Sequence, residues 1–127
     1  MSACRHKQYS IKELASLFDI SSRTIRYYEE MGLIKSADRE EPSEQRSFTD
    51  SERRRLKLIL RGKRLGFSLQ EIKEMVDLYE TNPKGQKEKK QILEITDQKL
   101  QQIDEKLLEL QTAKADILAY REKFENE

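Results

Sequence analysis

The sequence has very little of the residue types from which metal, redox and hydrolytic sites are built. Its 127 residues include one cysteine, Cys4, and one histidine, His6, so no disulfide can form within the chain. Two possible ligands in an N-terminal tail make a poor metal site, because structural zinc takes about four ligands. No nucleophile is paired with a base, and no glycine-rich phosphate loop occurs. We therefore expect no enzyme activity, no metal site and no cofactor.

Long apolar runs are also missing. No stretch approaches the roughly 20 apolar residues that cross a bilayer, and the N-terminus has no signal-peptide core. Charged residues make up 39% of the chain against 35% hydrophobic residues. Such a composition supports only a modest core, so much of the chain must be exposed or covered by a partner. We expect a cytoplasmic protein without membrane contact.

The two halves of the chain carry opposite charge. The formal net charge is +1, but residues 1–67 contain 15 Lys and Arg against 10 Asp and Glu, a net +5. Residues 68–127 contain 10 basic and 14 acidic side chains, a net −4. A basic front half and an acidic rear half predict contact with nucleic acid at one end only.

The most informative stretch is residues 21–32. Ser21 is suited to cap a helix, and Gly32 to end it in a left-handed turn. Upstream, residues 10–13 form a capping box that begins another short helix. On a period of 3.6 residues, one face of the second helix carries Arg23, Arg26 and Tyr27. The pair predicts a helix-turn-helix whose second helix enters a DNA major groove. The alternative is that these arginines are ordinary solvated helix charges.

The chain that follows has the layout of a wing. Residues 33–36 predict a short apolar strand, residues 38–45 a polar loop with a proline, and residues 46–48 a second strand. Arg39 and Arg46 would then lie where they could reach phosphates or a minor groove. Three glutamates make the loop less basic than a dedicated phosphate clamp.

Two further capping boxes begin two further helices. The box at residues 49–52 predicts a helix that runs to Leu65, and the box at residues 68–71 predicts one over residues 69–80. On the first helix, most arginines are expected to face outward: Arg53, Arg54, Arg55, Arg61 and Arg64. On the second, the side chains at core spacing are Leu69, Ile72, Met75, Val76 and Tyr79.

After a break at residues 82–85, the chain has no proline or glycine from residue 86 to residue 124. A helix of roughly 40 residues would extend about 60 Å. Apolar residues recur along it at heptad spacing: Leu93, Leu100, Ile103, Leu107, Leu110, Ile117 and Phe124. We expect this stripe to pair with a second copy in a coiled coil. The alternative is a monomer whose helix folds back on its own domain.

In this order, the motifs resemble those of MerR-family transcriptional regulators. The matching stretches are Tyr9-Ser10-Ile11, Glu13-Leu14-Ala15, residues 23–34, Arg46-Ser47-Phe48, Arg55-Leu56 and residues 64–72. The resemblance implies a mainly α fold with a winged helix-turn-helix, a small wing hairpin and a long dimerisation helix in an antiparallel coiled coil. It divides the chain into a tail (1–8), a DNA-binding domain (9–81), a linker (82–85) and a coiled-coil helix (86–127).

The resemblance also implies a function and a set of contacts. A homodimer would bind a pseudo-palindromic operator in double-stranded promoter DNA and distort it, which can realign the promoter for RNA polymerase. The positions that match DNA contacts of the family are Arg23, Thr24, Arg26 and Tyr27 in the recognition helix, Arg39 and Arg46 in the wing, and Arg61 and Lys63 in the second helix pair. Phe48 replaces a more usual tyrosine, and the wing lacks the frequent Asn-Gly turn.

The signal to which the protein responds is less defined. Metal and iron–sulfur sensors of the family need cysteines that this chain lacks after Cys4, and drug sensors carry a large C-terminal domain where only three residues follow here. Residues 55–69 with 77–80 are similar to the subgroup that controls branched-chain amino-acid and fatty-acid degradation, which implies an acyl-CoA-type effector by analogy. Tyr79 and Tyr120 are candidate effector contacts.

Two other classes of function remain open. A helical adaptor that binds another protein would show no salt-dependent DNA binding. An RNA-binding module is less well supported, because readers of single strands favour aromatic platforms on sheets.

Overall fold

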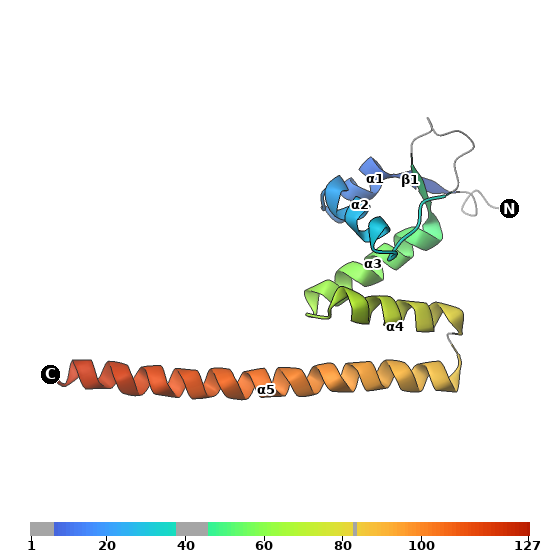
Figure 1. Cartoon of the computed structure of the whole chain (residues 1–127). Helices are drawn as coiled ribbons and strands as arrows, with labels where there is room; N and C mark the ends of the chain where they lie inside the picture. The colour runs from blue at the N-terminus through green and yellow to red at the C-terminus, as the bar shows by residue number, and fades with distance from the viewer. Residues whose placement is uncertain (1–6, 38–45, 83) are drawn as a thin grey trace. The chain divides into compact units, whose positions relative to one another are not determined.

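The computed structural model describes residues 7–37, 46–82 and 84–127, and it divides into two compact units (Figure 1). The first unit is Met1–Glu80 and the second is Thr81–Glu127. The elements in chain order are β1 (Gln8–Ser10), α1 (Ile11–Phe18), α2 (Ser22–Glu30), β2 (Ser47–Thr49), α3 (Asp50–Arg64), α4 (Leu69–Thr81) and α5 (Gln86–Glu125). This mainly helical architecture with a small antiparallel strand pair confirms the predicted fold class.

The helix-turn-helix begins and ends where the local sequence predicts. At α1, the Ser10 hydroxyl accepts from the Glu13 N–H at 3.0 Å, and the Glu13 carboxylate accepts from the Ser10 N–H at 2.8 Å. The turn between α1 and α2 places Asp19 in the left-handed region with φ 54°, which aspartate tolerates better than most residues. Ser21 caps α2 by accepting from the Thr24 N–H at 3.0 Å, and Gly32 follows the helix with φ 78°.

The strand predicted over residues 33–36 is wrong. These residues form no strand, and the partner of β2 is β1, with Tyr9 opposite Phe48 in an antiparallel register. Leu33 and Ile34 are both buried, at 1% and 3% exposure. A strand in a two-stranded sheet would turn one of two consecutive side chains outward. The core therefore takes both side chains, and a single backbone bond from Ala37 N to Ser47 O (2.7 Å) joins this segment to β2.

Every element of the first unit except β1 contributes to one buried core. Its members are Leu14, Ile25, Tyr28, Leu33, Ile34, Phe48, Leu56, Ile59, Ile72 and Val76. Phe48 is fully buried, which accounts for a side chain without a hydroxyl at this position. Tyr79, predicted at core spacing, is instead 54% exposed.

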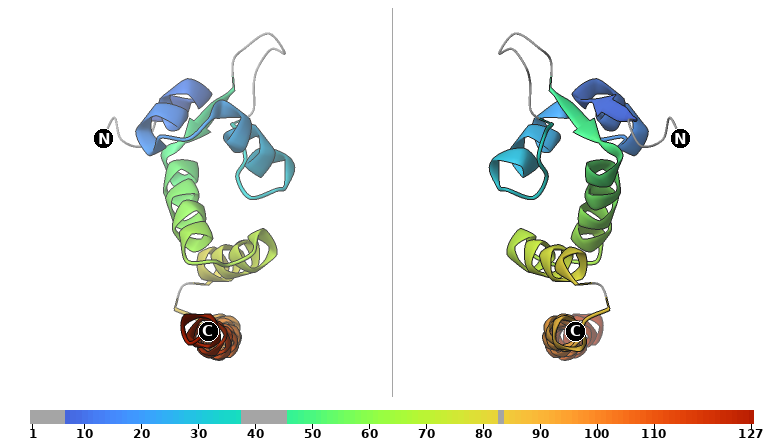
Figure 2. Two further views of the ribbon diagram at one scale, coloured as in Figure 1. Left: turned by 90° about the vertical axis from the view of Figure 1, so that its left-hand side faces the viewer. Right: turned by 90° about the vertical axis from the view of Figure 1, so that its right-hand side faces the viewer.

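Helices α3 and α4 follow one another in the chain (Figure 2), and they approach each other at Gly62. A Cβ atom at Gly62 would lie 2.8 Å from Cγ1 of Ile72, which is too short for two carbon atoms. Ile72 is 1% exposed, so it has little room to move away. The small residue thus lets the buried face of α4 reach α3.

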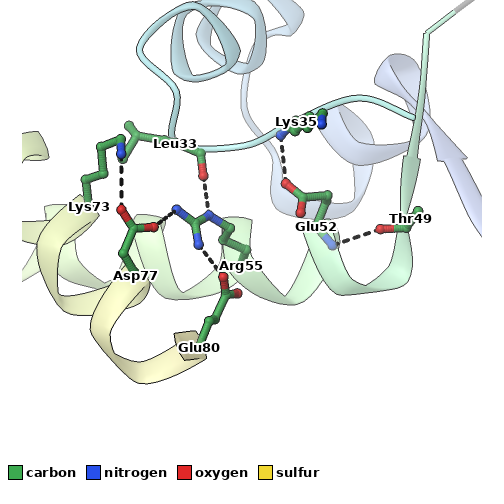
Figure 3. A network of polar contacts seen from close by, with 8 residues as sticks. All are labelled: Leu33, Lys35, Thr49, Glu52, Arg55, Lys73, Asp77 and Glu80. Atoms are coloured by element: carbon green, nitrogen blue, oxygen red, sulfur yellow. Dashed lines mark hydrogen bonds and ion pairs between the residues drawn. The ribbon is translucent and has the colours of Figure 1, made fainter. Parts of the chain in front are cut away.

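Arg55, predicted to face outward, is buried at 8% exposure. Its Nε donates to the Leu33 carbonyl, its Nη1 to Glu80 and its Nη2 to Asp77 at 2.6 Å (Figure 3). A guanidinium has five N–H donors, and it can be buried when acceptors surround it. Burial by itself lowers the pKa of Arg55, but the hydrogen bond to Asp77 and the charges of both carboxylates outweigh that effect and raise it.

The side chain of Glu52, also in Figure 3, does not bond to the N-cap residue of its own helix but to the segment that follows α2. Its carboxylate accepts from the Lys35 N–H at 2.7 Å, while its own N–H donates to the Thr49 hydroxyl at 3.3 Å. The second predicted capping box is therefore only half formed. The third is complete, with Ser68 and Glu71 bonded in both directions at 2.8 and 3.1 Å.

The second unit is dominated by α5, a helix of 40 residues in which none is buried. The seven heptad side chains are between 41% and 67% exposed. The long uninterrupted helix is thus confirmed, and its apolar stripe is open in the single chain. Among the described residues, we find no helix that is both long enough and apolar enough to cross a membrane.

Replacing Arg55 by lysine should destabilise the first unit. An ammonium group is a point charge and cannot reach three acceptors on two separate segments as a planar guanidinium does. We expect Arg55→Lys to lower the free energy of unfolding by about 1–3 kcal/mol. Urea titration at fixed protein concentration measures it. Arg54→Lys is the matched control, since Arg54 is 63% exposed, and it should change the value by less than about 0.5 kcal/mol. Equal effects of the two changes on the free energy of unfolding would show that the three hydrogen bonds of the buried guanidinium add no measurable stability.

The Asp77 carboxylate makes part of the stability dependent on pH. Partial burial works to raise its pKa, but the hydrogen bonds and charges of Arg55 and Lys73 outweigh burial and hold the pKa below its ordinary 3.8. The stabilisation is therefore complete above pH 3.8 and is lost as the pH falls below it. Asp77→Asn should cost about 0.5–1 kcal/mol at neutral pH, because nearly half of the side chain is solvated.

The difference between Asp77→Asn and the wild type should shrink as the pH falls from 7 to about 3, because below the ordinary pKa the unfolded chain binds the proton more readily than the folded protein does. Urea titrations at the two pH values measure it. Glu74→Gln removes an exposed carboxylate from the same helix, and it should have little effect at either pH. A difference for Asp77→Asn that is as large at pH 3 as at pH 7 would contradict the assignment.

Candidate nucleic-acid interface

Helix α2 has one face in the core and one face in solvent. Ile25 and Tyr28 are buried at 0% and 7% exposure. On the other side, Arg23 and Arg26 are exposed and Tyr27 is 48% exposed. The core contacts therefore fix the rotation of the helix and leave two guanidinium groups and a phenol free to meet a ligand. An exposed, basic second helix of this kind can enter a major groove.

Thr24 lies in the first turn of the same helix and is half-buried. Its hydroxyl is 2.9 Å from the Ser21 hydroxyl, and its N–H donates to the same oxygen. The hydroxyl thus belongs to the helix cap. Any contact of Thr24 with DNA would use a group that the cap has already oriented.

Tyr27 and Tyr28 are neighbours with different environments. Their ring centroids are 6.2 Å apart at an interplanar angle of 48°. Burial, with a smaller effect of Tyr27, raises the pKa of Tyr28 above its ordinary value. Tyr28 therefore serves as an uncharged core residue that supports the exposed ring of Tyr27.

Arg46, one of the two predicted wing contacts, is partly exposed and paired. Its Nε lies 3.3 Å from Oε1 of Glu29, and its side chain is 44% exposed. The other carboxylate oxygen of Glu29 accepts from the Ser36 hydroxyl at 2.7 Å. Arg39, the other predicted wing contact, lies outside the described residues.

Arg61 and Lys63 lie in the last turn of α3, together with Arg64, and all three are exposed. Positive charge at this end of a helix is favourable on its own, because it opposes the partial negative charge of the free carbonyl groups. The same cations are available to phosphates. Their exposed position is compatible with the predicted contacts to the DNA backbone. The presence of positive charge at this end of α3 also has a reason within the helix itself.

Asp50 forms a junction that the sequence did not suggest. Its carboxylate accepts from Arg53 at 2.6 Å, Arg54 at 2.7 Å and the Tyr9 hydroxyl at 3.1 Å. The hydrogen bond from Arg53 is the main reason that the pKa of Asp50 is lowered. The junction holds β1 against the first turn of α3.

Sequence reasoning thus missed four residues that hold the site together, Glu29, Asp50, Glu52 and Arg55. For Arg55 there was one signal. Arg55 lies one residue before Leu56 and four residues before Ile59, and both of these residues are fully buried. This spacing places Arg55 on the inner side of α3.

The two candidate effector contacts lie in different units. Tyr79 of α4 is 54% exposed and Tyr120 of α5 is 64% exposed. The ring of Tyr120 meets the edge of Phe124, with centroids 5.1 Å apart. Their joint role in binding an effector stays a prediction.

Across the described residues, no group of three or more His, Cys, Asp and Glu side chains could hold a metal ion.

Two family models match the chain. "MerR HTH family regulatory protein" covers residues 9–78, and "MerR, DNA binding" covers residues 53–120. The HTH-type transcriptional regulator ZntR of Escherichia coli (strain K12) is 34% identical over 106 residues, which are 82% of this chain and 72% of that protein. The HTH-type transcriptional regulator CueR of Escherichia coli O6:H1 is 30% identical over 110 residues, 87% of this chain and 78% of that protein.

Solved structures show the same fold. The regulator PbrR691 from Ralstonia metallidurans CH34, in complex with lead(II), has a TM-score of 0.77 at 25% identity, covering 89% of this chain and 85% of that one. HiNmlR, a MerR family regulator lacking the sensor domain and bound to promoter DNA, has a TM-score of 0.58 at 25% identity, covering 91% and 87%. With an exposed basic face on the second helix of its helix-turn-helix and these matches along its length, the chain belongs to the MerR family of DNA-binding transcriptional regulators.

Proposed function

We propose that this regulator binds a pseudo-palindromic promoter operator as a homodimer and distorts the DNA to control transcription by RNA polymerase. The observation that carries the proposal is the orientation of α2. Ile25 and Tyr28 anchor one face in the core, which turns the face with Arg23, Arg26 and Tyr27 outward. A rigidly held basic helix can read base edges, because its side chains start from fixed positions.

The predicted contacts divide into two physical classes. Arg23, Arg26 and Tyr27, with Thr24 at the helix cap, are proposed to read the major groove. Arg46 in the wing, with Arg61 and Lys63 at the end of α3, is proposed to contact phosphates, as is Arg39. Phosphate contacts fix the register of the protein, and base contacts supply the sequence preference.

The homodimer is supported by the open stripe on α5. Seven heptad positions with large apolar side chains, each more than 40% exposed, are a surface that a second helix would cover. Two recognition helices in one dimer would match two half-sites. Contacts at both half-sites would offset the free energy of bending the DNA between them.

The potential metal ligands of this chain favour a small molecule over a soft metal ion as the signal. One relative is named "Heavy metal-dependent transcription regulator 2", and PbrR691 was solved with lead(II). Soft ions prefer thiolates, because sulfur is polarisable. The only cysteine here is Cys4, and α5 contains none. We propose that an apolar, acyl-CoA-like effector contacts Tyr79 and Tyr120, and that the targets are genes of acyl-CoA or amino-acid catabolism, on the similarity of residues 55–69 and 77–80 alone.

The adaptor hypothesis makes a different experimental prediction. A protein that neutralises phosphates releases counterions, so its affinity for DNA falls steeply with salt. An adaptor without a DNA site would show no duplex preference and no such slope.

A charge placed in the α5 stripe should break the dimer. Leu107→Glu puts a carboxylate on the seam that a partner helix would cover, where it would lose its hydration. We expect light scattering to give the mass of two chains for the wild type and of one chain for the variant. The variant should also bind DNA weakly, because one domain makes too few contacts. Gln98→Glu adds the same charge away from the stripe and should stay dimeric. A wild-type mass of one chain would defeat the idea.

Arg26 and Arg61 should differ in what they contribute. If Arg26 reads a base, Arg26→Ala should lower the specific affinity by about 1–3 kcal/mol and the non-specific affinity much less. If Arg61 meets only phosphate, Arg61→Ala should weaken all duplexes nearly equally and reduce the salt slope by about one. Fluorescence anisotropy with a selected and a scrambled duplex at several salt concentrations measures both. The same ratio of specific to non-specific affinity in the two variants would show that these roles are misassigned.

A further inference from the structure

Glu29 of α2 contacts residues on both sides of the predicted wing loop, residues 38–45. Ser36 precedes residues 38–45 and Arg46 follows them. The Ser36 hydroxyl donates to Oε2 of Glu29 at 2.7 Å, and the Arg46 Nε lies 3.3 Å from Oε1. One carboxylate on the last turn of α2 therefore contacts a residue on each side of residues 38–45.

The position of this carboxylate is unfavourable in two respects. Glu29 lies in the last turn of α2, where free carbonyl groups carry a partial negative charge that repels it. It also lies on the helix proposed to enter DNA, where phosphates repel a negative charge. Its side chain is only 22% exposed, so solvent screens it incompletely. A carboxylate that is unfavourable both for its helix and for DNA binding is expected to have another function that offsets these costs.

The geometry of the ion pair suggests that role. The contact with Glu29 uses the Nε edge of the Arg46 guanidinium. The two terminal amino groups carry the four remaining N–H donors, in a plane suited to the oxygens of a phosphate. An arginine held by Nε has fewer rotamers to lose when it binds, which favours the bound geometry.

We propose that Glu29 is a positioning residue for DNA recognition. It fixes the wing ends on the recognition helix and aims the terminal amino groups of Arg46 at the DNA backbone. The inference rests on the proposed function and adds to it that the wing and the recognition helix contact DNA in one fixed register. It also accounts for a negative charge at this position, because the charge restrains Arg46 from binding phosphates out of register.

The main test is a double-mutant cycle of Glu29→Gln and Arg46→Gln. Glutamine keeps the size of Glu29 and an acceptor for Ser36, but it loses the ion pair. The probes are a duplex selected by the wild-type protein from a random-sequence pool and a scrambled duplex of the same length. We expect Glu29→Gln to lower the ratio of specific to scrambled affinity about three- to tenfold, mostly through loss of specific binding. The same change in the Arg46→Gln background should have little effect on the ratio.

Glu30→Gln is the matched control. It removes the same charge from the neighbouring, exposed position of the same helix. Lower repulsion from phosphates should then raise the affinity for both duplexes by a similar factor and leave the ratio unchanged. Arg46→Lys gives a second variant that leaves Glu29 intact. Its ammonium cannot bind Glu29 by one edge and a phosphate by another, so the ratio should fall as it does for Glu29→Gln. Thermal melting checks that each variant is folded.

Three outcomes would overturn the inference. Glu29→Gln could behave like Glu30→Gln, it could lower the ratio equally with and without Arg46, or Arg46→Lys could keep the wild-type ratio. If the wild-type protein selects no duplex from the pool, the proposed function fails, and the inference fails with it. A selected duplex with an additive cycle would leave the proposed function standing and remove only the role of Glu29.

Discussion

The first unit depends on one buried guanidinium. Arg55 donates to the Leu33 carbonyl after α2 and to two carboxylates of α4, so three separate segments share one cation. A charge in the interior is tolerated only when its donors are paired, so these segments must stay in register for the cation to remain there. The end of α2, α3 and α4 therefore form one body. This rigidity is what a reading helix needs if its exposed side chains are to meet base edges in fixed geometry.

Side-chain carboxylates replace regular backbone pairing around the same helix. Residues 33–36 lie in no strand, yet Lys35 donates its N–H to Glu52, and Ser36 donates to Glu29. Polar groups of a segment without a ladder still need partners when the segment packs on a core. Because each carboxylate belongs to a helix, the position of the irregular segment is set by α2 and α3. Ser36 and Arg46, on either side of residues 38–45, are thus tied to the helix that is proposed to read DNA.

The two units are stabilised in different ways. The first has a core of its own, whereas α5 leaves its apolar stripe exposed in the single chain. A long helix in water gains most of its stability from packing, so the order of α5 and the assembly of a dimer should be coupled. Relatives that carry metal-regulator names share the fold, but a sensing function depends on the ligands in the site. An α5 without cysteine does not carry over a thiolate site.

The sequence by itself determined the helices, because their signals act over three or four residues. Ser10 with Glu13, Ser21 with Thr24 and Ser68 with Glu71 bond within one turn, and the heptad pattern needs only the period of α5. The exposed face of α2 followed from the same periodicity. Tertiary structure alone decided that β1 pairs with β2, that Leu33 and Ile34 are both buried, and which of three consecutive arginines enters the core. Those outcomes depend on partners more than 20 residues away in the chain, such as Asp77 and Glu80 for Arg55. Local pattern carries no information about which distant acceptors will surround a buried charge.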